Sequence, residues 1–410
     1  MNNIFLLYID PGTGSMLFSL FIGLAAAATF GMRALIMKLK FVISGGKAEK
    51  EDLNNIPFVI FSDHKRYWNV FKPICDEFER RGIDVVFYTA SPDDPALSEN
   101  YEHVKAEYLG DKNKPYARLN MLRADILLAT TPGLNIYQWK RSKGVKCYVH
   151  IPHSISDFAG YRQFALDYYD SVIASGENQL PSMRKLEELR PSLHKKEFKV
   201  VGSTYLDSMK KRLDSMENCT RNEKKIVLVA PTWGKSGILS KFGEKFLAAL
   251  QKTDFRIIVR PHPQSVVSEQ SILKPLQEKF SEFEWNFDND NFDVLKRADI
   301  MITDFSGVMF DYSLVFDKPL IYTDTEFDKS PYDADWLDEP MWEFTILDKL
   351  GIQLKEDQFD DMQNVIEKAI ASESLKESRK QVRSVAWQNQ GMAAGTTVDY
   401  LIEKRLSVIS

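Results

Sequence analysis

Two histidines stand directly after apolar, β-rich runs of the sequence, where an imidazole can reach a binding cleft. The RPHP sequence at 260–263 follows the run FRIIV, and His153 follows the run VKCYVH. A guanidinium binds phosphate through paired hydrogen bonds, and an imidazole donates to a phosphoryl oxygen or moves a proton near neutral pH. We therefore expect Arg260 and His262 to bind phosphate and His153 to act as a general base. The alternative for 260–263 is a proline-fixed turn in which the histidine only caps a strand.

His150 lies three residues before His153, at the end of the same apolar run. We expect His150 to be packed within the strand and His153 to face the cleft beyond it. Base catalysis by a positioned side chain typically contributes about 100- to 10,000-fold in rate. The pattern alone leaves open which of the two histidines is the base.

The turn TDFSG at 303–307 follows the apolar run DIMI and precedes a helical pattern. The start of a helix offers free backbone N–H groups and a positive dipole end, which together bind anions. We assign Asp304, Ser306 and Gly307 to a phosphate site, and Asp311, one helical turn later, to the hydroxyls of a polyol. The alternatives are an ordinary helix cap for the turn and a solvated carboxylate for Asp311.

The loop PTWGKS at 231–236 superficially resembles a nucleotide-hydrolysing P-loop. Val229 stands where that motif requires glycine, which excludes this interpretation. The loop still offers Thr232 and backbone amides to a phosphate.

Two further groups are weaker candidates. His64 follows the first apolar run and is an acceptor-side candidate, although a turn and helix start is the favoured explanation. The acidic sequence at 288–290 resembles a metal-binding pair but precedes a helical segment, where Asp and Asn are common solvated caps. We therefore expect no metal and no other cofactor.

Nine apolar runs alternate with helical patterns and must position these residues. They are PFVIF, IDVVFY, DILLAT, VKCYVH and SVIAS, then KIVLVA, FRIIVR, DIMIT and PLIYT. Such alternation is typical of parallel sheets covered on both faces, with ligands at the carboxyl ends of the strands. The pattern predicts an α/β protein with two doubly wound, Rossmann-like domains facing a cleft. The expected divisions are an anchor and linker (1–50), an acceptor-side domain (51–202), a donor domain (203–353), and C-terminal helices (354–410), the last crossing back.

Residues 16–32 are uncharged and mainly apolar, and cations follow the run but do not precede it. With the snorkelling of Arg33 this stretch is long enough to cross a hydrocarbon core of about 30 Å. The distribution of cations predicts a single-pass membrane helix with the catalytic domains in the cytoplasm. A cleaved signal peptide is the alternative.

The composition limits the class of partner. The 410 residues carry a formal net charge of −5, so there is no global basic field for nucleic acid. The three cysteines are far apart in the sequence and show no metal-binding or disulfide spacing, which fits a reducing compartment. We expect Cys75 and Cys147 to pack in the core.

Three motifs, APTW, RPHP and TDFSGVMFDY, resemble in order and approximate spacing the CDP-glycerol glycerophosphotransferase family of teichoic-acid primases and polymerases. The resemblance covers residues 225–325 and is weaker over 145–205 and 391–393. It implies a GT-B fold, transfer of glycerol phosphate from CDP-glycerol to a hydroxyl, release of CMP and two essential histidines. His262, Ser306 and Asp311 match family positions.

The chain departs from the family pattern at two places. Gly307 replaces the second serine of the family's DYSS turn, and the sequence Pro-His-Ser at 152–154 stands where Trp-His-Gly is common. The first departure removes a donor for phosphate or ribose, and the second bears on the assignment of His153 as the base.

The expected function is a membrane-anchored transferase that moves a polyol phosphate from a CDP-activated donor to a hydroxyl of a lipid-linked or glycan acceptor. In-line attack at phosphorus depends mainly on positioning and charge stabilisation, so fixed cations and dipoles suffice. Two alternatives stay open: a UDP-sugar glycosyltransferase or epimerase of the same fold, and a catalytically silent nucleotide-binding protein of envelope assembly.

Overall fold

The computed structural model describes residues 55–410 apart from 217–223, 289, 324–335 and 339. The predicted membrane helix and its linker lie outside these described residues, as does Cys219. Within the described ranges, no helix is both long and apolar enough to span a bilayer.

A seven-stranded parallel sheet forms the first half, in the order β3-β2-β1-β4-β5-β6-β7. Its inner strand β1 has five consecutive buried residues because helices cover both faces of the sheet. In register, Phe61 pairs with Ala129 and Ala129 with His150, so the carboxyl ends of three strands lie side by side. The strands are β1 (Ile56–Ser62), β2 (Val85–Thr89), β3 (Val104–Tyr108), β4 (Arg123–Ala129), β5 (Gly144–His150), β6 (Ser171–Ala174) and β7 (Glu197–Val200).

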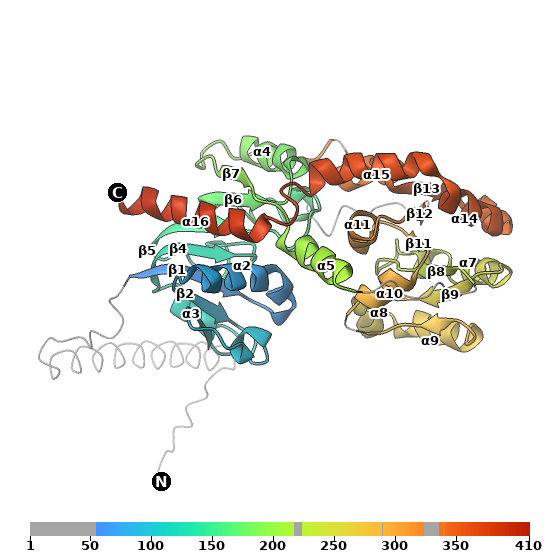
Figure 1. Ribbon diagram of the computed structural model, residues 1–410, viewed down its shortest axis with the longest axis horizontal. Helices are drawn as coiled ribbons and strands as arrows, with labels where there is room; N and C mark the ends of the chain where they lie inside the picture. Colours follow the sequence, from blue (N-terminus) through green and yellow to red (C-terminus); the bar gives the residue numbers. More distant parts are fainter. Residues whose placement is uncertain (1–54, 217–223, 289, 324–335, 339) are drawn as a thin grey trace, which may run out of the picture. The chain divides into compact units, whose positions relative to one another are not determined.

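Helices α2 (Trp68–Arg81) and α16 (Ala393–Ile409) cover one face of this sheet and lie beside each other (Figure 1). The other face packs against α3 (Lys114–Leu119), α4 (Leu180–Glu188) and the chain between β4 and β6. Cys75 and Cys147 are buried in the first of these layers, and burial raises the pKa of both thiols. Their predicted core packing is confirmed.

A six-stranded parallel sheet forms the second half, in the order β10-β9-β8-β11-β12-β13. Its strands are β8 (Ile226–Val229), β9 (Arg256–Val259), β10 (Glu284–Trp285), β11 (Ile300–Thr303), β12 (Leu320–Thr323) and β13 (Gly351–Leu354). One face packs against α6 (Ile238–Lys241), α7 (Gly243–Gln251), α9 (Gln270–Lys279) and α14 (Met362–Ala371). The other packs against α5 (Thr204–Asp214), α10 (Phe292–Arg297), α11 (Val308–Phe310), the π-helical turn η6 (Asp311–Val315), α13 (Leu347–Leu350) and α15 (Glu373–Ala386).

The link from α15 to α16 passes tightly over the chain that joins the two sheets. A Cβ on Gly202, whose φ is +100°, would lie 2.6 Å from the carbonyl oxygen of Gln388. The indole Nε1 of Trp387 donates to Asp207 in α5 at 2.8 Å, and the amide of Ala393 donates to the same carboxylate. This crossing lies at the carboxyl ends of β6 and β7, where the amide of Gln388 donates to the carbonyl oxygen of Ser175 and the side chain of Asn389 donates to that of Val200.

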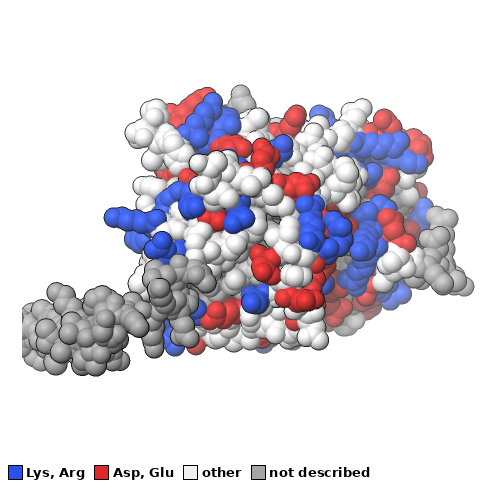
Figure 2. Space-filling view, turned by 60° about the vertical axis from the view of Figure 1, so that its left-hand side comes forward, with Lys and Arg blue, Asp and Glu red and all other residues white. Residues whose placement is uncertain are grey.

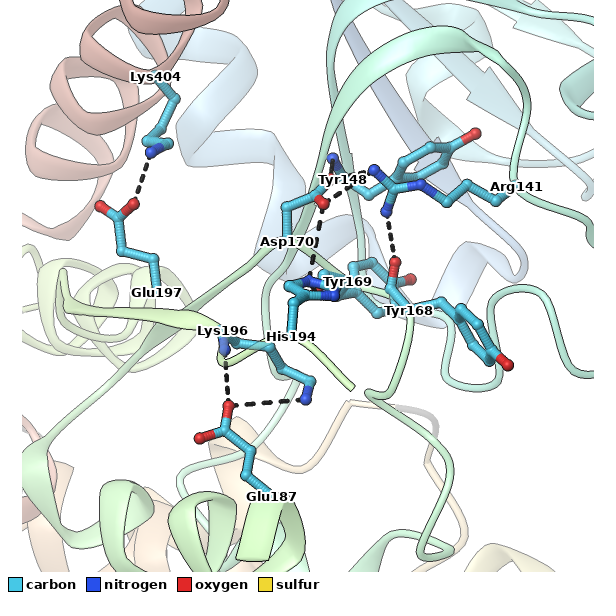
Figure 3. Close-up of polar contacts among 10 residues, drawn as sticks. All are labelled: Arg141, Tyr148, Tyr168, Tyr169, Asp170, Glu187, His194, Lys196, Glu197 and Lys404. Carbon is cyan, nitrogen blue, oxygen red and sulfur yellow. Dashed lines mark hydrogen bonds and ion pairs between the residues drawn. The ribbon is translucent and has the colours of Figure 1, made fainter. Parts of the chain in front are cut away.

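A group of polar contacts surrounds the amino-terminal end of β6 in the first sheet (Figure 3). Arg141 binds both oxygens of Asp170 at 2.8 and 2.7 Å, and Asp170 also accepts from the amide of Tyr148. The ring of His194 is 3.0 Å from the carbonyl oxygen of Tyr169. His194 therefore has a structural role.

The surface charge is mixed. Figure 2 shows basic and acidic side chains interspersed over the face that it presents. Ion pairs at the surface of the protein include that of Arg118 with Glu107.

Candidate functional site

Loops from the two sheets line a cleft with two adjoining chambers. The first chamber, of about 280 Å³, is lined by His153, Asp157, Thr232, His262, Ser306 and Glu343 among others. The second chamber, of about 290 Å³, is lined by Arg66, Tyr67, Asn69, Tyr205 and Asp311 among others. His153, Ser154 and Gly307 line both, so they form the neck between the chambers.

His262 follows β9 and caps the start of α8 (Pro263–Ser268). Its Nδ1 accepts a hydrogen bond from the amide of Gln264 at 3.1 Å. In the neutral ring the proton must therefore be on Nε2, which makes that nitrogen a donor. Burial lowers the pKa of His262, and this favours the neutral ring near pH 7. The residue is suited to donate a hydrogen bond to a phosphoryl oxygen in the first chamber.

His153 lies on the other side of the same chamber, beyond β5. Its ring centroid is 5.1 Å from that of Tyr67, and it stacks on Tyr161 at 6.4 Å. Desolvation of the ring, together with the positive charge of the nearby Arg66, lowers the pKa of His153. A neutral imidazole open to the cleft can accept a proton.

His150 is fully buried at the end of β5, as expected from the sequence. Aromatic rings surround it, and neither ring nitrogen has a hydrogen-bond partner among the described residues. Burial lowers its pKa to about 3. His150 lines neither chamber, so of this pair only His153 can meet a substrate.

Asp304 has a different role from the predicted contact with phosphate. Its side chain is buried and accepts hydrogen bonds from the amides of Thr232, Ile238, Phe305 and Ser306. Burial nevertheless raises its pKa to about 6. Through these bonds the carboxylate of Asp304 holds the turn after β11 against the loop after β8. A carboxylate that faced a phosphate would repel it.

The same bonds change the expectation for Thr232. Its amide is occupied by Asp304, so it is not offered to a ligand. The residue itself still lines the first chamber, next to Trp233.

Ser306 and Gly307 both line the first chamber at the start of α11. The cap position belongs to Gly307, and Ser306 makes no side-chain cap bond there. A Cβ added to Gly307 would meet no heavy atom within 4 Å, so the cleft is open at this point. The helix here is short, with α11 running directly into η6.

Arg260 does not line either chamber. Its guanidinium donates to Asn286 Oδ1 and, at 2.7 Å, to the carbonyl oxygen of Asp288. Arg260 therefore stabilises the segment that follows β10. The phosphate contact that we predicted for it does not fit this position, because the guanidinium is directed to that segment. Its backbone amide donates to Val229, which keeps the loop before His262 in register with β8.

Asp311 faces the second chamber instead of the first. Tyr205 donates to its Oδ2 at 2.9 Å and Asn291 to the same oxygen at 3.4 Å. Burial raises the pKa of Asp311 to about 7. The carboxyl group is thus able to exchange hydrogen bonds as donor or acceptor.

His64 lies outside both chambers. It is exposed and caps the short helix η2 (Lys65–Tyr67) by accepting from the amide of Arg66. The structure therefore shows the alternative that we gave for His64, a residue at the start of a helix. Arg66 and Tyr67, which follow it, reach the second chamber instead.

Asp157 and Glu343, which both line the first chamber, were not predicted as site residues because no sequence motif marks them. The amide of Asp157 donates to Glu343 Oε2 at 3.3 Å, and Asp157 Oδ2 accepts from the amide of Trp342 at 3.0 Å. Glu343 is buried in α12 (Trp342–Thr345), and burial together with the Asp157 carboxylate raises its pKa to about 7. This contact joins the two halves across the cleft between residues 186 positions apart.

The acidic residues at 288 and 290 are engaged by neighbouring side chains. Asp288 accepts from Asn286 at 2.7 Å, and Asp290 pairs with Arg212. In the part of the chain that the structure describes, no group of three or more His, Cys, Asp or Glu side chains is placed to hold a metal.

Residues 201–337 match the family model of CDP-Glycerol:Poly(glycerophosphate) glycerophosphotransferase. The predicted family resemblance is confirmed. The chain is also 25% identical over 279 residues to the teichoic acid glycerol-phosphate primase of Bacillus subtilis (strain 168), across 61% of this chain and 70% of the relative. The resemblance indicates a glycerophosphotransferase-like enzyme.

Solved structures agree on the fold. The wall teichoic acid polymerase TagF covers 92% of this chain, with 98% of its own chain matched, at a TM-score of 0.57 and 16% identity. UDP-GlcNAc 2-epimerase from Neisseria meningitidis covers 85%, with all of its own chain matched, at a TM-score of 0.52 and 13% identity. The predicted GT-B-like α/β architecture is confirmed.

The family match covers only some of the residues that line the cleft. Thr232, His262, Ser306 and Gly307 lie within the matched residues of this glycerophosphotransferase-like chain. His153, in the first sheet, lies outside them, and so its role depends on the geometry of the cleft.

Proposed function

We propose that this enzyme transfers a glycerol phosphate, or a related polyol phosphate, from a CDP-activated donor to a hydroxyl of a lipid-linked or cell-envelope glycan acceptor, releasing CMP. The observation that carries the proposal is the placing of two histidines from different sheets in one chamber, where both have a lowered pKa and the Nδ1 of His262 accepts a hydrogen bond from Gln264. One of them is ready to accept a proton and the other to donate a hydrogen bond.

The reaction follows from these positions. The acceptor oxygen attacks the phosphorus that bears the polyol, and its proton passes to His153. The bond from that phosphorus to the bridging oxygen breaks, and this oxygen leaves with CMP. His262, through Nε2–H, and Ser306 stabilise the charge that develops on the phosphoryl oxygens. The buried carboxylate of Asp304 keeps the two donor loops in place without facing the phosphates.

Donor and product identity provide the test. The purified full-length protein is incubated with membrane extract and, in turn, CDP-glycerol, CDP-ribitol and UDP-N-acetylglucosamine, and nucleotide release is measured. We expect CMP from a CDP-activated donor only. Release of UDP would support the sugar-nucleotide alternative, and tight CDP binding without turnover would support a silent nucleotide-binding protein.

The histidine assignment is tested in the same assay. Replacing His153 by Ala should lower turnover about 100-fold or more while leaving CDP affinity nearly unchanged, because a general base acts in the transition state. His103→Gln is the matched control, because this histidine pairs with Asp84 at the surface. Turnover of His153→Ala within a few-fold of the parent would remove His153 from the mechanism.

We further propose that residues 16–32 anchor the enzyme in the membrane with the cleft on the cytoplasmic side, which fits their apolar run and the cations that follow it. The full-length protein should stay with membranes through an alkaline carbonate wash. Recovery of the full-length protein in the soluble fraction would exclude the anchor.

A further inference from the structure

The loop after β5, which carries the base, is fixed within its own half at three consecutive carbonyl oxygens. The side-chain amide of Gln179 donates to the carbonyl oxygen of Ser154 at 3.1 Å and to that of Ser156 at 2.8 Å. The side-chain amide of Asn178 donates to the carbonyl oxygen of Ile155 at 3.0 Å. Both amides come from the short helix after β6, so they hold the loop to the first sheet but do not set its distance from the second.

The same loop is also attached to the second half through an apolar side chain. Ile155 is only 3% exposed and belongs to the buried cluster that covers one face of the second sheet. That cluster also contains Met309 and Phe310 of α11. Because separation of the halves at this point would return apolar surface to water, the packing of Ile155 opposes it.

Two hydrogen bonds join the loop to α12 in a reciprocal arrangement, which we call the clasp. The amide of Asp157 donates to Glu343 Oε2 at 3.3 Å, and the amide of Trp342 donates to Asp157 Oδ2 at 3.0 Å. The other oxygen of Asp157 accepts from the amide of Ala159 at 2.9 Å, which orients the carboxylate. Each partner gives a backbone donor and a carboxyl acceptor, so the loop cannot slide along α12 without breaking both bonds.

Helix α12 in turn packs against both ends of the donor turn, residues 305–310. The rings of Phe344 and Phe305 have centroids 5.8 Å apart. The rings of Trp342 and Phe310 are stacked, with centroids 5.7 Å apart and planes at 18°. Because protein interiors are close-packed and transmit displacements, a shift of the donor turn is passed through α12 to the clasp.

We propose that the clasp sets the place of His153 relative to the donor turn, so that Asp157 and Glu343 are positioning residues, and that a nucleotide at this turn orders the base loop through α12. The inference rests on the proposed function, in which His153 takes the acceptor proton. Transfer requires the base, the acceptor oxygen and the phosphorus to be aligned, and a misplacement of about 1 Å can lower the rate about 100-fold.

Three variants and one control test the clasp. Asp157→Ala removes both of its acceptor atoms, and Glu343→Ala removes the acceptor for the amide of Asp157. Glu343→Gln retains an oxygen that can accept from the same amide. The matched control is Asp94→Ala, because Asp94 caps a short helix by accepting from the amide of Ala96, as Asp157 does from Ala159, and lines neither chamber.

Amide hydrogen exchange, measured by mass spectrometry on the full-length protein, reports on the clasp directly because both of its donors are backbone amides. Asp157→Ala should speed exchange at 341–345, in the other half, about 3- to 10-fold, as expected for the loss of one hydrogen bond. Glu343→Ala should do the same at 155–159, and Asp94→Ala should change neither segment. CDP should slow exchange at 155–159 in the parent but not in Asp157→Ala.

Turnover in the CMP-release assay tests the positioning role. Asp157→Ala and Glu343→Ala should each lower kcat about 10-fold or more, while the affinity for CDP, measured by calorimetry, changes by less than about 3-fold. The double variant should be no slower than the slower single variant, because both substitutions remove the same contact. Glu343→Gln should stay within about 3-fold of the parent, since it keeps the acceptor.

The two measurements separate this inference from the proposed function. Faster exchange across the cleft in both Ala variants supports the clasp even if the parent releases no CMP, in which case only the proposed function fails. Exchange that changes only in the half carrying the substitution overturns the inference even if the parent is active. An equal effect of CDP in the parent and Asp157→Ala also overturns it, as does full turnover of both Ala variants, because His153 would then be placed without the clasp.

Discussion

The buried carboxyl group of Glu343 gives the sharpest prediction on stability. Its pKa is raised to about 7, against 4.5 for the group in an unfolded chain, so the folded state favours the protonated form. The contribution of this group to stability is therefore present below about pH 4.5 and is lost as the pH rises to about 7. A shift of this size corresponds to about 3 kcal/mol.

Glu343→Gln copies the protonated form and cannot ionise. We expect little difference from the parent at pH 5, and we expect the variant to be more stable than the parent at pH 8 by up to about 3 kcal/mol. The assay is urea unfolding of the full-length protein at both pH values, followed by tryptophan fluorescence. Because the difference between variant and parent is used, other groups that titrate in this range, such as Asp311, cancel.

The matched control is Glu367→Gln, on the exposed face of α14, where the carboxylate accepts from Gln363. The control should change stability by the same small amount at both pH values. An equal effect of Glu343→Gln at pH 5 and pH 8, or a variant less stable at pH 8, would refute the reasoning. It would mean that the carboxyl group is solvated or that its charged form is stabilised in the cleft.

Three further predictions concern the loops and strands around the cleft. His150→Ala should lower the free energy of unfolding by about 2 to 4 kcal/mol, because it opens a cavity among aromatic rings, and the CDP affinity should stay near that of the parent. Thermal unfolding measures the stability and calorimetry measures the CDP affinity. A variant as stable as the parent would show that the site is loosely packed. Asp304→Ala should both destabilise the protein and weaken CDP binding, since four backbone amides lose their acceptor. A variant that is as stable as the parent but binds CDP more weakly would instead indicate that Asp304 contacts the phosphates directly. Gly307→Ser should fold as the parent because the added atoms enter open space, and its CDP affinity should be equal or higher; a loss of stability would contradict the geometry of this turn.

The strands show where sequence patterns are informative and where they are not. Each of the nine predicted runs forms a strand, and these runs are the inner strands of the two sheets. Inner strands of a parallel sheet are covered on both faces, which requires a continuous apolar run. The four unpredicted strands, β3, β7, β10 and β13, are the edges of the sheets. β3 and β7 alternate between exposed and more buried residues, β10 has only two residues, and the middle of β13 is only partly buried, so no such run marks them.

The sequence by itself determined which loops meet at the cleft. His153, Thr232, His262 and Ser306 each follow a buried strand, and parallel strands bring their carboxyl ends to one edge of a sheet. This placement depends only on local order along the chain.

Only the tertiary structure decided which way the side chains face. The guanidinium of Arg260 donates to Asn286, and the carboxylate of Asp304 accepts from the amide of Thr232. The contact of Asp157 with Glu343 brings together residues far apart in the chain, in a segment without a strand to mark it. Such choices depend on hydrogen-bond partners that fold into reach from distant positions, and no local pattern of residues encodes them.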